Sequence, residues 1–129
     1  MTSLCKRALL AGLGALSLSA AAFAQYPNKP IKIIVPFLAG GTTDIMARAV
    51  AADLQKAFGQ AVVVENRAGA GGVIGSDAVA KSAPDGYTLV LSNIASHAIG
   101  PSVYSKMPYD AVKDFTHIGL IAAVPSGVA

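Results

Sequence analysis

The chain has 129 residues, a formal net charge of +3 and a single cysteine, and 53% of its residues are hydrophobic. This length suits one small domain and excludes two complete domains. The chain has no cluster of lysine and arginine that would indicate nucleic-acid binding, and a single cysteine excludes an internal disulfide.

The first segment of the chain has the pattern of a secretory signal peptide. Lys6 and Arg7 precede the apolar run "ALLAGLGALSLSAAAF", which ends in the small-residue pattern Ala22-Phe23-Ala24. We expect cleavage after Ala24, which leaves 105 residues with eight basic and seven acidic side chains and no thiol, because Cys5 lies in the signal. The alternative is an uncleaved anchor, although the run is short and rich in alanine and glycine for a membrane span.

The first predicted unit is a strand followed by a helix. "IKIIVPF" (31–37) is a short β-branched run, which predicts a buried strand. Thr42 or Thr43 is predicted to cap the following helix, with Asp44 in its first turn, and Gly59 is placed to end it. The predicted apolar face of this helix consists of Met46, Val50, Leu54 and Phe58, widened by Ala47, Ala51 and Ala57.

The pattern then alternates between strands and helices. Residues 61–66 predict a second strand, "RAGAGGVIG" leads into a helix that runs to about Lys81, and residues 87–93 predict a third strand. Residues 94–104 indicate a loop that leads to a short helix, and residues 116–124 predict a fourth strand. The order favours an α/β fold, a βαβαβ unit with a parallel sheet and helical crossovers.

Glycine-rich or polar segments follow each of the first three strands. They are "PFLAGGTTD", "ENRAGAGG" and "SNIAS", and ligands of open α/β sheets bind beyond the carboxyl ends of strands. A glycine turn that opens a helix offers free N–H groups and the positive end of the helix dipole, which suit a carboxylate or a phosphate. Tight-turn geometry alone explains such glycines equally well. The neutral hydrogen-bonding partners in these segments are Thr42, Thr43, Ser92, Asn93 and Ser96.

The sequence assigns no catalytic residue, metal or cofactor. His97 and His117 lack carboxylates or cysteines at metal-ligand spacing, and a surface or helix-capping role is favoured for His97. Asp44 is either a base or a partner of the helix dipole, and the second is the commoner role. Glu65 and Arg67 are expected to pair with other parts of the fold in a structural role, and Tyr87, Tyr104 and Tyr109 are expected to be packing or rim residues.

Three long motifs in order, "YPNKPIKIIVPFLAGGTTDIMAR", "VVVENRAGAGGVIGSDAVAKSAPDGYTLVL" and "PYDAVKDF", give this chain a family resemblance. It resembles the Bug family, the TctC-like substrate-binding proteins of tripartite tricarboxylate transporters. The resemblance implies a periplasmic protein of two-lobed, venus-flytrap form (type II-like) that closes on a dicarboxylate, amino acid or aromatic acid. It also implies contact with the membrane components of a transporter, with no stable membrane insertion after signal cleavage.

The same resemblance implies a set of ligand-binding residues in the segments after the strands. The loop after the first strand forms the expected carboxylate cradle, the loop after the third strand adds contacts, and the glycine turn after the second strand lies on the same rim. The set comprises Phe37, Gly40, Gly41, Thr42, Thr43, Asp44, Gly71, Gly72, Ser92, Asn93 and Ser96.

The length of the chain departs from that of a two-lobed protein. Residues 25–129 are therefore expected to form a partial first lobe, an amino-terminal fragment from which the second lobe is missing. Two alternatives stay open at this point. One is an exported α/β enzyme for an anionic substrate, with Asp44 or His97 as acid or base, and the other is a non-functional remnant of the binding protein.

Overall fold

The computed structural model describes residues 26–123, so the predicted signal peptide lies outside the described residues. The elements, in chain order, are β1 (Ile31–Val35), α2 (Thr42–Phe58), β2 (Val62–Asn66), η2 (Ala70–Gly72), α3 (Val73–Ala80), β3 (Thr88–Val90), η3 (Ala95–Ile99) and α4 (Gly100–Val103). The strand–helix–strand–helix–strand order confirms the predicted βαβαβ unit. None of the helices in this range is long and apolar enough to cross a membrane.

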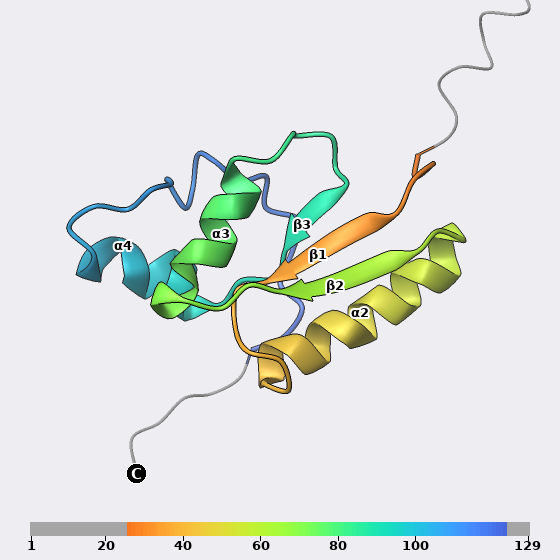
Figure 1. Cartoon of the computed structure of the whole chain (residues 1–129), viewed down its shortest axis with the longest axis horizontal. Coiled ribbons are helices and arrows are strands. Elements are labelled where there is room, and N and C mark those ends of the chain that lie inside the picture. The colour runs from red at the N-terminus through yellow and green to blue at the C-terminus, as the bar shows by residue number, and fades with distance from the viewer. Residues whose placement is uncertain (1–25, 124–129) are drawn as a thin grey trace, which may run out of the picture.

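The three strands form one parallel sheet in the order β2-β1-β3, with β1 in the centre (Figure 1). Ile33 of β1 aligns with Val64 of β2 and with Leu89 of β3. The central strand is the most apolar of the three, and Ile31, Ile33, Ile34 and Val35 are all buried. This explains why "IKIIV" carries β-branched side chains on both faces, as a strand covered on both sides requires.

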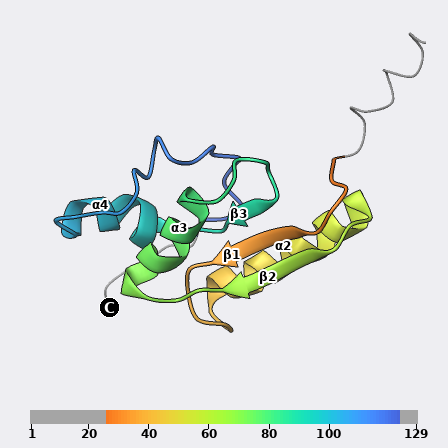
Figure 2. The same cartoon turned by 45° about the horizontal axis from the view of Figure 1, so that its top comes forward.

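The two long helices cover opposite faces of the sheet (Figures 1 and 2). Ile33 and Val35 pack with Ala47 and Ala51 of α2, and Ile34 alternates to the face that carries α3. The predicted apolar face of α2 is shifted in the structure. Small alanines let the helix lie close to the sheet, so Met46 and Val50 are only half-buried and Phe58 is 45% exposed. Gly59 ends α2 with a φ of 64°, as predicted.

The three predicted strands of the sheet are each shorter in the structure, β2 by one residue only, and the predicted fourth strand is absent from the described residues. β1 stops at Val35, since Pro36 has no N–H for the ladder, and β3 spans only Thr88–Val90. Residues 116–123 form no strand, so the predicted fourth strand is wrong over the described part of 116–124. A strand needs a neighbour to complete its hydrogen bonds, and here Ile118 and Leu120 are 82% and 85% exposed.

The segment 94–104 is more helical than predicted. A π-helical turn, Ala95–Ile99, continues directly into α4, where the sequence indicated a loop before a short helix. The polar stretch that follows is irregular, as its composition suggests. There, Asp110 Oδ1 accepts hydrogen bonds from the backbone N–H groups of Val112 and Lys113 at 2.9 and 3.0 Å.

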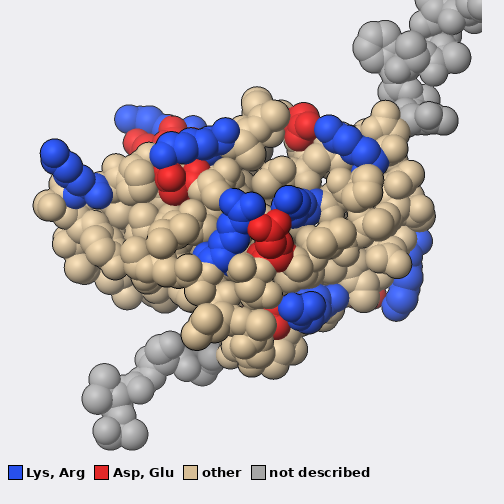
Figure 3. All heavy atoms as spheres, in the orientation of Figure 1, with Lys and Arg blue, Asp and Glu red and all other residues tan. Residues whose placement is uncertain are grey.

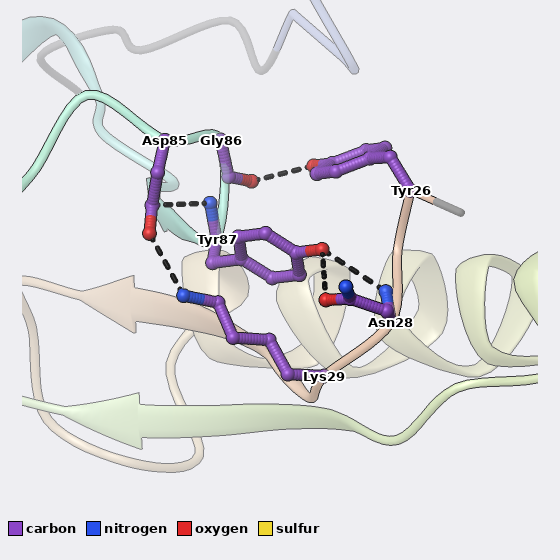
Figure 4. Close-up of polar contacts among 6 residues, drawn as sticks. All are labelled: Tyr26, Asn28, Lys29, Asp85, Gly86 and Tyr87. Atoms are coloured by element: carbon purple, nitrogen blue, oxygen red, sulfur yellow. Dashed lines mark hydrogen bonds and ion pairs between the residues drawn. The ribbon is translucent and has the colours of Figure 1, made fainter. Parts of the chain in front are cut away.

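At the amino ends of β1 and β3, six side chains and backbone groups form an amino-end cluster (Figure 4). Its members are Tyr26, Asn28, Lys29, Asp85, Gly86 and Tyr87. The Tyr26 hydroxyl donates to the Gly86 carbonyl at 2.6 Å, and Lys29 Nζ lies 2.9 Å from Asp85 Oδ2 and 4.3 Å from the centre of the Tyr87 ring. These contacts join the segment before β1 to the turn before β3, at the end of the sheet away from the predicted ligand site.

Candidate functional site

Three loops leave the carboxyl ends of the strands, and we call residues 36–44, 67–72 and 91–96 the rim. A Cβ atom placed on Gly72 would lie 3.0 Å from both Phe37 Cζ and Ser96 Cβ. One predicted site residue from each loop therefore meets at a single point. The parallel topology brings these positions together, because all three strands end at the same edge of the sheet.

The start of α2 presents free backbone donors to the rim. Gly41 is the cap residue, in extended conformation, and no side chain makes a capping hydrogen bond. The first helical hydrogen bond runs from the Ile45 N–H to the Gly41 carbonyl at 3.0 Å, so the N–H groups of Thr42, Thr43 and Asp44 have no acceptor within the helix. The predicted capping by Thr42 or Thr43 is wrong, because both lie inside the first turn.

Asp44 is the residue that organises this loop from inside. Its side chain is buried, and Oδ2 accepts hydrogen bonds from the Gly40 N–H at 2.9 Å and Arg48 Nε at 3.0 Å, while Oδ1 accepts one from Asn66 Nδ2 at 3.0 Å. The hydrogen bond from Arg48, followed by those from Gly40 and Asn66, lowers the pKa of Asp44 to about 2. The Asp44 carboxylate is thus ionised, and both of its oxygens accept hydrogen bonds from other groups of the chain. Its reach back to Gly40 resembles the reciprocal half of a capping box.

Asn66 couples the end of β2 to the same loop. Its amide nitrogen also donates to the Phe37 carbonyl at 3.2 Å, and its Oδ1 accepts a hydrogen bond from Arg48 Nη2 at 3.2 Å. Neither Arg48 nor Asn66 was among the site residues predicted from the sequence. Arg48 lies one turn after Asp44 on α2, an i,i+4 spacing that the sequence does show, whereas Asn66 reaches Asp44 only through the pairing of β2 with β1. Arg67, two residues beyond Glu65, pairs with that carboxylate rather than with another part of the fold, and Glu65 also pairs with Lys32 of β1.

The glycine turn after β2 has side chains of other segments packed against it on two sides. Gly72 has a φ of 94°, in the region that favours glycine, and its Cα faces the Phe37 ring. Gly71 lies beside the hydroxyl of Tyr104, which stands 3.3 Å from the position of a Cβ on that glycine. Tyr104 therefore belongs to the edge of the rim.

The loop after β3 contributes one buried and two more accessible polar residues. Ser96 is fully buried, its Oγ donates to the Asn93 carbonyl at 3.3 Å, and its own carbonyl accepts a hydrogen bond from the Tyr109 hydroxyl at 2.8 Å. Asn93 is exposed and Ser92 is half-buried. Asn93 Oδ1 accepts a hydrogen bond from the Ala95 N–H at 2.9 Å, which leaves the amide nitrogen and one lone pair of Oδ1 for other partners.

His97 is half-buried against two aromatic rings. Its ring centre lies 4.8 Å from that of Phe115 and 5.7 Å from that of Tyr109, and its Nδ1 is 3.0 Å from Ser96 Oγ. Burial, and to a smaller extent the nearby His117, lowers the pKa of His97. His97 thus keeps a partly exposed place in the last turn of η3, as expected, and in addition lies beside the Ser96 hydroxyl.

The charges of the described residues are interleaved rather than gathered by sign. Figure 3 shows acidic side chains beside basic ones across the face drawn there. Residues 26–123 contain no group of three or more His, Cys, Asp or Glu side chains that would hold a metal ion. The rim therefore offers hydrogen-bond donors of the backbone and neutral side chains, which suit reversible binding of an anion.

Comparison with known proteins identifies the family. The model of the tripartite tricarboxylate transporter family receptor, TctC, matches residues 46–129. The chain belongs to this family. TctC proteins are receptors, which is a binding role and not an enzymatic one, and the assignment agrees with the resemblance to Bug proteins.

Named relatives of this receptor family support the fold. BugT of Bordetella pertussis is 54% identical over 101 residues, which are 78% of this chain and 31% of BugT. MatC of Rhodopseudomonas palustris with bound malate is 38% identical, with a TM-score of 0.68 over 70% of this chain and 31% of MatC. An R. palustris protein with adipate is 41% identical, with a TM-score of 0.65 over 67% of this chain and 29% of that protein.

This chain spans about a third of the length of the curated TctC relatives it matches. The solved TctC-like structures are likewise matched over less than a third of their length. One of those structures is described as a periplasmic transporter, 46% identical with a TM-score of 0.67.

Proposed function

We propose that this chain supplies the carboxylate-binding rim of a periplasmic receptor that captures a small carboxylate for tripartite tricarboxylate transport. The single observation that carries the proposal is the uncapped start of α2, whose free N–H groups lie on the rim where three loops converge. Its family membership supports the proposal, as do the malate and adipate in two related structures.

Binding in this proposal uses no covalent chemistry. The N–H groups of Thr42 and Thr43 donate to the ligand carboxylate, and the positive end of the α2 dipole favours its charge. The Thr hydroxyls and the Asn93 amide supply further hydrogen bonds. Arg48 balances the ionised Asp44 behind the loop, so the ligand does not meet an unpaired negative charge.

The proposal includes the organisation and location of the protein. Residues 1–24 direct export to the periplasm, and residues 25–129 provide part of one lobe of a two-lobed receptor. The coverage of about a third of the relatives supports this view. If a partial lobe is unable to fold alone, the exported chain will show no cooperative thermal transition. A cooperative transition with a midpoint that a carboxylate raises would refute the idea of a non-functional remnant.

A pair of substitutions at Thr42 tests the role of the backbone donors. Thr42→Pro removes the N–H at the first helical position, where proline fits, and the preceding Gly41 is already extended at ψ 167°. Thr42→Ala removes the hydroxyl and one methyl group and keeps the N–H. Each hydrogen bond to a charged group contributes ~1.5–3 kcal/mol, so the proline variant should bind carboxylates about tenfold more weakly or worse.

The measurement is titration of the exported full chain with succinate and hexanoate, followed by NMR chemical shifts. The alanine variant should retain more affinity than the proline variant, because the N–H remains. Equal affinity of the wild type and Thr42→Pro would refute the assignment of the α2 start as the anion site.

A further inference from the structure

The side chain of Asn66, the last residue of β2, contacts both ends of the loop between β1 and α2. Its Nδ2 donates hydrogen bonds to the Phe37 carbonyl at 3.2 Å and to Asp44 Oδ1 at 3.0 Å. Its Oδ1 accepts a hydrogen bond from Arg48 Nη2 at 3.2 Å. A primary amide has two N–H donors, so both donors are used inside the molecule and the orientation of the amide is fixed.

Asp44 carries this restraint to the backbone of the loop. Its carboxylate is buried, and Oδ2 accepts hydrogen bonds from the Gly40 N–H at 2.9 Å and from Arg48 Nε at 3.0 Å. Gly40 is exposed and has a φ of 85°, and because glycine is conformationally permissive, its own preference does not hold it in place. The side chains of Asn66, Asp44 and Arg48 restrain the loop and leave the free N–H groups of the α2 start available to a ligand.

We infer that Asn66 is a positioning residue of the proposed anion site. Its amide, acting through Asp44, holds the backbone between Phe37 and Asp44 in the shape that presents the α2 start to a carboxylate. This inference rests on the proposed function and adds to it a residue that lies behind the loop and does not touch the ligand. A loop that is held before the ligand arrives loses less conformational freedom on binding than a mobile loop does, and its affinity is higher for that reason.

Asn66→Asp tests the amide with almost no change in size. The variant has an oxygen in place of Nδ2, so the hydrogen bonds to Phe37 and Asp44 are lost and two carboxylates face each other. Binding of succinate to the exported full chain, followed by NMR titration near neutral pH, should weaken about tenfold or more. Asn28→Asp is the matched control, because it makes the same change of charge in the amino-end cluster and keeps the oxygen that accepts from the Tyr87 hydroxyl. The control should leave the affinity for succinate unchanged.

A reciprocal exchange separates this hydrogen-bonded role from a general loss of structure. In the double variant Asp44→Asn/Asn66→Asp, the amide now at position 44 donates to the carboxylate now at position 66, and its oxygen still accepts from Gly40 and Arg48. Four of the five hydrogen bonds are kept, and the bond to the Phe37 carbonyl is lost. The double variant should therefore bind succinate about twofold more tightly than Asn66→Asp or better, as expected for side chains in direct contact.

Hydrogen exchange of the Gly40 N–H, measured by NMR without ligand, tests the restraint apart from binding. This amide should exchange more slowly in the wild type and in the double variant than in Asn66→Asp. Equal exchange or equal affinity in the wild type and Asn66→Asp overturns the inference while carboxylate binding stands, and so does a double variant that binds no more tightly than Asn66→Asp. If the wild type binds neither succinate nor hexanoate, the proposed function fails, and a role of Asn66 in its site fails with it.

Discussion

Replacing Gly72 with alanine tests the contact at which the three rim loops meet. The residue has a φ of 94°, which L side chains rarely adopt. The new methyl group would lie 3.0 Å from Phe37 Cζ and from Ser96 Cβ, and 3.3 Å from Phe37 Cε1. Both neighbours must move by a few tenths of an ångström, so the variant disturbs the site and the fold together.

The expected loss of stability follows from two contributions. A left-handed conformation costs a non-glycine residue about 1–2 kcal/mol, and overpacking typically costs about 1–3 kcal/mol, which gives about 2–5 kcal/mol for Gly72→Ala. Gly40→Ala is the matched control, because Gly40 has a φ of 85° but no atom within 4 Å of its Cβ position. The control should lose only the backbone contribution, about 1–2 kcal/mol.

Thermal unfolding of the full chain, followed by far-ultraviolet circular dichroism, measures both losses. For a domain of about 100 residues, 1 kcal/mol lowers the midpoint by about 4–8 °C, so Gly72→Ala should lower it by about 8 °C or more. Gly40→Ala should lower it by less. Equal midpoints for the two variants would refute the close approach of Phe37 and Ser96 to Gly72.

Three further predictions concern the core and the titrating side chains. Val35→Ala, at a fully buried site, should destabilise the fold by about 2–3 kcal/mol in denaturant titrations, while Val63→Ala at a half-exposed site should stay within about 0.5 kcal/mol. Because the pKa of Asp44 falls from 3.8 to about 2 on folding, its stabilising contribution is complete above about pH 5 and is lost progressively as the pH falls through about 2. Thermal midpoints between pH 2 and 6 should show this loss, and Asp44→Asn should remove this part of the slope. Folding lowers the pKa of His97, so the stability of the fold should decrease as the pH drops below 6.5. The variant His117→Gln should raise the pKa of His97, as measured by NMR titration, because the nearby His117 contributes to lowering it. An unchanged His97 pKa in this variant would contradict the role of His117.

Local patterns were sufficient for the strands and helices that form the βαβαβ unit. "IKIIV" predicts β1 because its β-branched residues suit a strand buried on both faces, and Gly59 marks the end of α2 through its own backbone preference. Residues 116–123 show the limit of such patterns. Their apolar character is typical of a strand, but the strand state depends on a partner that the local sequence does not specify.

The candidate site likewise contains positions that the sequence predicts and contacts that it does not. The positions of Phe37, Gly72 and Ser96 at one edge could be predicted, because parallel strands bring their carboxyl ends together. The hydrogen bond from Asn66 to Asp44 could not, since it depends on the register of β2 against β1 and on the rotation of α2, whereas the i,i+4 spacing of Asp44 and Arg48 was a local signal for their pair. The same rotation explains why Ala47 and Ala51, rather than Met46 and Val50, face the sheet.

The amino-end cluster has a practical consequence for how this protein can be handled. Tyr26 is bonded to Gly86 at the start of the sheet, while the rim lies beyond its other end. A strand rises ~3.3 Å per residue, so the five residues of β1 separate the two ends by about 17 Å. A linker to a solid support that enters at Tyr26 would anchor the molecule with its rim directed away from the surface. Attachment through Leu38 or Asn93 would instead place the support against the rim.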